Sequence, residues 1–256
     1  MNKYFCLLLL IFPLMGLAQL EPIASEVYHW KRPSTNMEIN YRASVLFEGS
    51  AHDMEWLQVN AGQLIPSETK NMFVVPDNEE YLLIIKAGTL LVTLRDSVHE
   101  ITGGSIALLM PGEIFHLQNE QKTACEFYWM KYRSKLPPDM DRGKNAGGSI
   151  VKSWYKIDFK PHDKGGIRNY FERPTAMSKR FEMHVTTLKA GIKSHEPHIH
   201  RAEEIVLMID GNTEMQIGQR FFKGKNGSVF YLGSNVSHAI RNEGTNPCMY
   251  FAFQFE

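Results

Sequence analysis

Residues 191–211 read GIKSHEPHIHRAEEIVLMIDG, and this stretch decides the fold. His198 and His200 are two positions apart, so in a β-strand both side chains lie on one face. Glu204 follows them, and a continuous apolar run, Ile205 to Ile209, ends at a tight-turn pair. We therefore predict a strand that carries ligand-type side chains at its start and then enters a core.

A fourth ligand candidate, His238, lies beyond two further predicted strands and a turn. An antiparallel meander can return it to a position beside the first three residues. Three imidazoles and one carboxylate suit a first-row divalent ion with open positions for water or substrate. The alternative is that these histidines only line a polar pocket. We predict one divalent transition metal per chain, with Mn, Fe, Zn, Ni and Co all open, held by His198, His200, Glu204 and His238.

The chain repeats itself after about 123 residues, which indicates two copies of one fold. In each copy, turn signals recur every 8–12 residues or so without a helical period, which is typical of an all-β sandwich or barrel. The expected matches are Glu79-Glu80 with Glu203-Glu204, Gly104-Ser105-Ile106 with Gly227-Ser228-Val229, His116 with His238, and Cys125 with Cys248.

Charge and cysteine content exclude several classes of function. The 256 residues carry 28 Lys plus Arg and 28 Asp plus Glu, so nothing favours nucleic acid or an anionic membrane surface as a partner. Of the three cysteines, Cys6 lies near the N-terminus, while Cys125 and Cys248 each lie in an apolar strand and are too few for a disulfide framework. Buried free thiols are therefore expected.

The N-terminus has the features of a secretory signal peptide. Lys3 precedes an apolar run from Phe5 to Leu17, and Gly16 and Ala18 supply small residues for cleavage before Gln19. The alternative is an uncleaved anchor, although the run is short and Pro13 interrupts it. We expect an exported protein, periplasmic or secreted, with no stable membrane insertion after cleavage.

The ligand candidates lie in a pattern that resembles the two cupin motifs. The first motif matches Gly191, His198-Ile199-His200, Glu204 and Gly211. The second matches Gly227, Gly233-Ser234-Asn235, His238 and Asn242, with its usual turn Pro and Gly replaced. The resemblance implies an all-β fold of two tandem cupin barrels, each a double-stranded β-helix or jelly roll. The implied domains are a signal peptide at 1–18, an N-terminal barrel at 19–133, a linker at 134–149 and a metal-binding C-terminal barrel at 150–256.

The N-terminal copy matches the cupin pattern less well. Val74 and Pro76 stand where the repeat places His198 and His200, and only Glu80 and His116 remain as ligand types. One carboxylate and one imidazole rarely hold a metal alone. We expect a degenerate metal site here and a structural role for this barrel.

Three further residues are candidates for catalysis. Glu182 and His184 share one face of a predicted strand, Phe181 to Leu188, and would reach the metal-bound ligand if that face points inward. His195 is a rim residue, a fifth ligand or an acid/base. Glu203 should point outward into solvent because its neighbour Glu204 points inward.

The overall plan is similar to bicupins of the (S)-ureidoglycine aminohydrolase type, which implies metal-dependent hydrolysis in ureide metabolism. The metal ligands depart from that family's pattern, so only the architecture is carried over. We expect hydrolysis or isomerisation of a small polar or anionic metabolite, of sugar, uronate or ureide type. An iron-dependent dioxygenase and a non-catalytic metal-dependent binder are the alternatives, and a homodimer is an open expectation.

Overall fold

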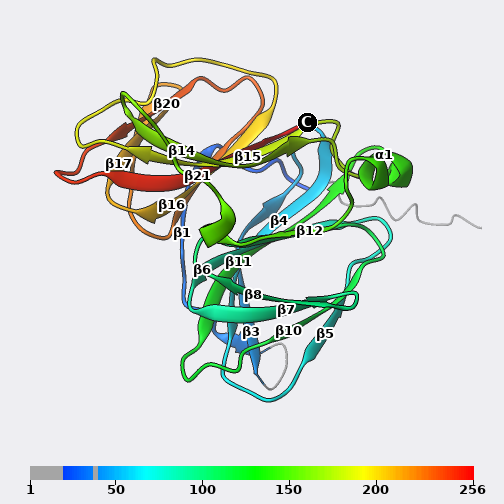
Figure 1. Cartoon of the computed structure of the whole chain (residues 1–256). Helices are drawn as coiled ribbons and strands as arrows, with labels where there is room; N and C mark the ends of the chain where they lie inside the picture. The colour runs from blue at the N-terminus through cyan, green and yellow to red at the C-terminus, as the bar shows by residue number, and fades with distance from the viewer. Residues whose placement is uncertain (1–19, 37–39) are drawn as a thin grey trace, which may run out of the picture.

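The structure, a computed structural model, describes residues 20–36 and 40–256. Its regular elements are almost all strands, with one short helix, α1 (Met140–Asn145), and one 3-10 turn, Trp154–Lys156. Figure 1 shows two barrels that pack against each other, the N-terminal one in blue to green and the C-terminal one in yellow to red. The all-β expectation is confirmed.

The N-terminal barrel encloses its core between a large and a small antiparallel sheet. Its large sheet has the strand order β12-β9-β6-β11-β4-β3-β2 and its small sheet β5-β10-β7-β8. These strands are β2 (Thr35–Asn36), β3 (Tyr41–Gly49), β4 (Met54–Leu64), β5 (Asn71–Val74), β6 (Glu80–Ala87), β7 (Thr89–Leu94), β8 (Ser97–Thr102), β9 (Ile106–Leu109), β10 (Ile114–Gln118), β11 (Cys125–Ser134) and β12 (Ile150–Lys152).

The C-terminal barrel repeats this plan. Its large sheet has the order β1-β19-β16-β21-β15-β14-β13 and its small sheet β18-β17-β20. These strands are β1 (Glu26–His29), β13 (Lys160–His162), β14 (Gly165–Arg173), β15 (Phe181–Leu188), β16 (Glu203–Asp210), β17 (Thr213–Ile217), β18 (Arg220–Gly224), β19 (Ser228–Leu232), β20 (His238–Asn242) and β21 (Cys248–Phe255).

The two large sheets exchange strands across the boundary expected from the sequence. β1 comes from the N-terminal part of the chain but pairs with β19, with Val27 opposite Phe230. β12 follows the linker but pairs with β9, with Val151 opposite Ala107. The linker itself contains α1, whose first turn is capped by Asp139. Each barrel is thus completed by a strand from the other half of the chain.

Side chains form three apolar cores. One core fills the N-terminal barrel and one fills the C-terminal barrel. A third, which we call the shared core, lies between the barrels and combines Leu82 and Ile84 of β6 with Ile205 and Leu207 of β16. The central strands β6 and β16 are therefore buried on both faces, which explains their continuous apolar runs.

Cys125 and Cys248 are buried free thiols, and burial raises the pKa of Cys125 to about 12. In the described part of the chain, no helix is long and apolar enough to cross a membrane. The predicted signal peptide, residues 1–18, lies outside the described residues.

Candidate metal centre

The four predicted ligands converge at one end of the C-terminal barrel. His198 and His200 lie in the segment before β16, Glu204 is the second residue of β16, and His238 is the first residue of β20. The backbones of His198 and His238 pair as an antiparallel bridge, with N–H···O distances of 3.2 and 3.0 Å. This bridge fixes the first motif against the second.

Backbone carbonyls orient two of the imidazoles. Nδ1 of His200 donates to the carbonyl of Ala202 at 2.7 Å, and Nδ1 of His238 donates to that of Val236 at 2.8 Å. Since a carbonyl can only accept, each ring carries its proton on Nδ1 and directs Nε2 toward the centre. Each Nε2 lies 3.2 Å from Oε2 of Glu204.

The electrostatics of the cluster fit a bound cation. Burial alone would raise the pKa of the Glu204 carboxyl, but contacts with His200 and His238 outweigh it and hold that pKa at about 2. Burial and the neighbouring histidines lower the pKa of His198, which favours its neutral, ligating form. The ligand nitrogens of His198, His200 and His238 lie within 4.8 Å of one another.

One buried atom in this cluster lacks a partner. Nε2 of His238 has no hydrogen bond although the residue is only 2% exposed, because with the ring proton on Nδ1 both Nε2 and the Glu204 carboxylate are acceptors. An unpaired buried nitrogen is costly, and a metal ion at the centre of the cluster would satisfy it. The residues present therefore fit a divalent transition metal.

The cavity beside the cluster has a volume of about 180 Å³. His184 lines it, and Nδ1 of His184 lies 3.3 Å from Oε1 of Glu182, whose other oxygen accepts a hydrogen bond from Arg180. Glu182 and His184 therefore lie on the inward side of β15. His195 also lines the cavity; its ring centroid is 4.2 Å from that of His198 but 6.3 Å from that of His238.

Sequence reasoning missed several polar groups in this cavity. Gln254 of β21 lies opposite Glu204, with Nε2 3.3 Å from the carboxylate and 3.4 Å from Nε2 of His200. Tyr250 lies on the same strand face, and Ser194 and Thr186 also line the cavity. The alternation of β21 was the available signal, since positions 250, 252 and 254 share one face.

The expectation that Glu203 points into solvent is wrong. Glu203 is 1% exposed and lies between the barrels, where its Oε1 accepts hydrogen bonds from the Tyr231 hydroxyl and the His52 N–H, the latter at 2.7 Å. Strand alternation does place the Glu203 and Glu204 side chains on opposite faces of β16. The face that carries Glu203, however, packs against the other barrel and is not exposed to water. Glu204 points inward, as predicted.

The expected match of Glu80 and His116 to metal ligands is also wrong. Glu80 lies opposite Tyr132 in β11 as Glu203 lies opposite Phe255 in β21, so Glu80 is the counterpart of Glu203. The counterpart of Glu204 is Tyr81, and His116 lies on the outer side of β10.

Aromatic side chains take the ligand positions in the N-terminal barrel. Phe115 pairs with Leu94 as His238 pairs with Ile217, and Phe73 pairs with Phe115 as His198 pairs with His238. The rings of Phe73 and Phe115 lie 5.4 Å apart, and Trp129 lies 4.9 Å from Phe73 and 5.8 Å from Tyr81. A packed aromatic cluster thus fills the space that holds the histidines in the other barrel.

Two family profiles match the chain, one within each barrel. The profile of the cupin domain matches residues 184–253, which include all four predicted ligands. The profile of the AraC-like ligand binding domain matches residues 77–142. No curated protein sequence matches the chain.

Solved structures share the two-barrel fold at low identity. AerE from Microcystis aeruginosa is 13% identical, with TM-score 0.65, covering 90% of this chain and 98% of AerE. Protein Ylba from E. coli, of family DUF861, is 12% identical, with TM-score 0.70 and coverages of 94% and 95%.

A third structure extends the comparison to an enzyme complex. The Lactobacillus farciminis oxalate decarboxylase formate complex is 14% identical, with TM-score 0.65 and coverages of 91% and 86%. Such identities show the fold alone. The two sheets of each barrel, the matched family profiles and these structures agree: the chain is a two-barrel member of the cupin superfamily.

Proposed function

We propose that the C-terminal barrel binds one divalent transition metal through His198, His200, Glu204 and His238, and that the chain is an enzyme acting there on a small polar or anionic metabolite. The observation that carries this proposal is the convergence of three imidazoles, two of them oriented by backbone carbonyls, and a carboxylate, with Nε2 of His238 buried and unpaired. The aromatic cluster in the N-terminal barrel supports a count of one metal per chain.

Charge and size narrow the substrate class. A divalent cation beside one ionised Glu204 and neutral imidazoles leaves a net positive charge in a buried site, which an anionic or strongly polar substrate oxygen would offset. The cavity of about 180 Å³ is below the range of roughly 300–1,000 Å³ that holds drug-sized ligands. The proposed substrate is therefore a molecule of a few carbons.

The chain's own residues supply a proton acceptor. Glu182 lies beside His184 and can stabilise its imidazolium, which suits His184 to take a proton from the substrate or from water. The guanidinium of Arg180 holds the Glu182 side chain in place through an ion pair. A metal bound here would polarise a carbonyl or activate water, and both hydrolysis and isomerisation use that chemistry.

Metal content tests the first half of the proposal. Full-length protein from its native compartment should contain one equivalent of a single transition metal by elemental analysis. The double variant His198→Ala/His200→Ala should lose that metal, and the matched control His116→Ala should keep it. Two equivalents per chain, or retention by the double variant, would exclude this centre.

Turnover separates an enzyme from a binder. Small hydroxy, oxo and amide carboxylates would be incubated with metal-loaded protein and followed by NMR, with oxygen consumption as the readout for the iron dioxygenase alternative. His184→Asn should lower kcat at least about 100-fold while the metal stays bound. A ligand that co-purifies with the wild type and with His184→Asn, and that both release unchanged, would favour the binding alternative.

Export and assembly remain proposals based on the sequence. The mature chain should begin near Gln19, and mass spectrometry of the native protein that finds residues 1–18 still attached would contradict this. A homodimer, and the lack of a nucleic-acid partner, also stay predictions.

A further inference from the structure

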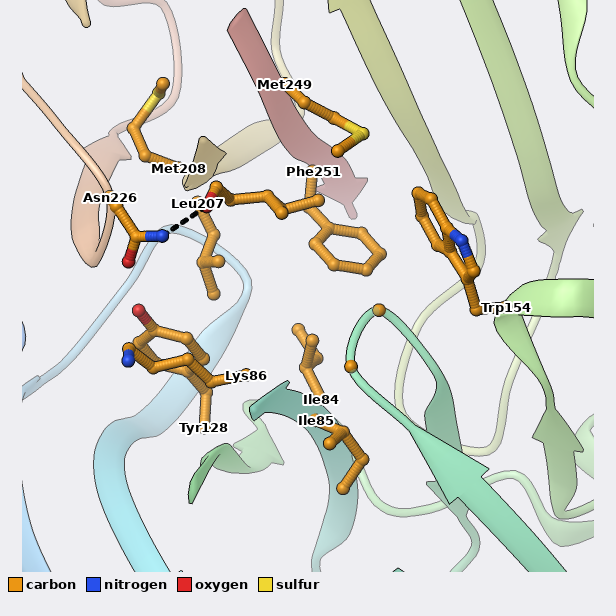
Figure 2. Close-up of a pocket in the computed structure, with 13 residues that line it drawn as sticks. Ile84, Ile85, Lys86, Tyr128, Trp154, Leu207, Met208, Asn226, Met249 and Phe251 are labelled. Carbon is orange, nitrogen blue, oxygen red and sulfur yellow. Dashed lines mark hydrogen bonds between the residues drawn. The ribbon is translucent and has the colours of Figure 1, made fainter. Parts of the chain in front are cut away.

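A second cavity, of about 270 Å³, lies between the two barrels (Figure 2). Ile84 of β6 forms one wall, and Leu207, its counterpart in β16, forms the opposite wall. No residue that lines this cavity also lines the cavity beside the metal ligands. It is therefore a separate site, built by the packing of the repeats.

The lining is apolar and carries no free charge. Figure 2 shows Met249, Phe251 and Trp154 along the upper part of the cavity. Lys86 is the single charged side chain in the lining, and its ammonium lies 2.8 Å from the Glu126 carboxylate. Because that ion pair leaves no net charge at the wall, the cavity favours a neutral ligand over an acid.

One polar group in the wall of the cavity lacks a hydrogen-bond partner among the described residues. The hydroxyl of Tyr128 is buried and has no hydrogen-bond partner among the described residues. Figure 2 shows it on the same side as Asn226, an exposed side chain whose amide donates to the Ile209 carbonyl at 2.6 Å. A buried hydroxyl without a partner is uncommon, and a polar ligand atom entering beside Asn226 would satisfy it.

Size and wall chemistry define the ligand class. A dry apolar cavity of about 150 Å³ holds benzene, so one of about 270 Å³ has room for two fused rings. The thioether of Met249 makes favourable contacts with aromatic rings and adapts to their shape. The aromatic rings of Phe251 and Trp154 can contact such a ligand in stacked or edge-on arrangements.

We propose that the cavity between the barrels binds a neutral bicyclic aromatic molecule with one polar atom, which hydrogen-bonds to the Tyr128 hydroxyl. The ligand contacts both barrels, so its binding stabilises their association. This site does not depend on the proposed metal chemistry.

Two probes that differ by one hydroxyl test the proposal. Full-length protein would be titrated with naphthalene and with 2-naphthol by equilibrium dialysis. Both should bind saturably, and 2-naphthol should bind about fivefold more tightly, the effect of one net hydrogen bond. Tyr128→Phe should remove this preference and leave the affinity for naphthalene unchanged.

Three variants locate the binding. Met249→Trp fills the cavity and should weaken both probes at least tenfold, whereas Met249→Leu conserves volume and should bind normally. The His198→Ala/His200→Ala protein should also bind normally. No saturable binding, equal affinities of the wild type for both probes, or loss only in the histidine variant would overturn the proposal. If Met249→Trp does not fold, Tyr128→Phe decides alone.

Discussion

Glu203 and Glu204 are neighbours in β16, and their carboxylates lie on opposite sides of one sheet. Glu204 contacts His200 and His238 inside the C-terminal barrel, and Glu203 accepts hydrogen bonds from Tyr231 and His52 between the barrels. Both are less than 10% exposed, so burial alone does not separate their roles. The hydrogen-bond and ion-pair partners of the two carboxylates do separate their roles, and substitutions can measure the difference.

Exchanging each carboxylate for an amide should separate metal binding from stability. Glu204→Gln removes the anionic ligand and should weaken metal binding at least tenfold with the fold intact. Glu203→Gln replaces charge-assisted hydrogen bonds by neutral ones and should cost about 1 kcal/mol of unfolding free energy without a change in metal affinity. Metal titration and urea unfolding measure the two effects. The opposite pattern would mean that the register of β16 is off by one residue.

Glu80 occupies the position of Glu203 in the other repeat and should make stability pH-dependent. Burial raises the pKa of its carboxyl, although hydrogen bonds from Thr175 and Tyr132 oppose this. A raised folded-state pKa means that its contribution to stability is present below the ordinary carboxyl pKa, about 4.3, and is lost as pH rises through the raised value. Glu80→Gln removes the titration, so the variant should gain stability relative to wild type as pH rises.

Urea unfolding of both proteins across a pH series checks this expectation. His116→Ala, a change on the outer side of the same barrel, is the control and should follow the wild-type profile. A difference between wild type and Glu80→Gln that does not vary with pH would contradict the assignment.

At the scale of elements, the strand exchange ties each barrel to the opposite half of the chain. β1 pairs with β19, while Tyr28 of β1 packs against Phe47 of β3, with ring centroids 4.4 Å apart. The Tyr28 hydroxyl donates to the carbonyl of Ala24 at 3.0 Å. One short strand thus contacts both barrels.

Removing that ring should destabilise the whole protein. Tyr28→Ala should lower the unfolding free energy by about 2 kcal/mol, less than for a fully buried aromatic, because Tyr28 keeps partial exposure. Tyr155→Ala, at a side chain that is 82% exposed, is the matched control and should change stability by no more than about 0.5 kcal/mol. Equal effects of the two changes would show that β1 adds little.

Some features of these elements could be predicted from the sequence, and others could not. The spacing of His198, His200 and Glu204 and the alternation of strands predicted the ligand cluster, because both are local properties. The environment of Glu203 depends on which face of β16 packs against the other barrel. A local sequence pattern does not contain that information. The unbroken apolar run after Glu204 was a partial signal, since a strand with one face in water alternates.

The repeat was located correctly but aligned one residue off in β6. Matching the paired glutamates by identity put Glu80 against Glu204, whereas the cross-strand partners put Tyr81 there. Identity misled because the interface position, and not the ligand position, keeps its glutamate in both repeats. That aromatic residues replace the metal ligands at Tyr81, Phe115 and Phe73 can be recognised only when the strand register is known.

At the scale of the molecule, the two repeats differ in what fills their interiors. One interior keeps polar groups around a cavity, and the other is closed by Phe73, Tyr81, Phe115 and Trp129. The closed barrel presents β6 to β16 across the shared core and receives β12, while its half of the chain contributes β1 to the other barrel. It holds none of the four predicted metal ligands. This arrangement suits the N-terminal barrel to a supporting role.

The shared core and the exchanged strands should make the two barrels unfold as one unit. Domains that unfold independently usually meet at more polar interfaces. Here Leu82 and Ile84 pack against Ile205 and Leu207 in a continuous apolar layer. All four tryptophans, Trp30, Trp56, Trp129 and Trp154, lie in the N-terminal half or between the barrels, whereas the predicted metal ligands belong to the C-terminal barrel.

During heating, tryptophan fluorescence therefore reports on the N-terminal barrel and the shared core, and metal release reports on the C-terminal barrel. If unfolding is cooperative, both signals should change at one temperature, and the calorimetric enthalpy should equal the van't Hoff enthalpy. Leu207→Ala, in the shared core, should shift both signals together to lower temperature by a destabilisation of about 2–5 kcal/mol. Release of the metal well before the fluorescence change would show that the C-terminal barrel opens on its own, and that the shared core is too weak to couple the repeats.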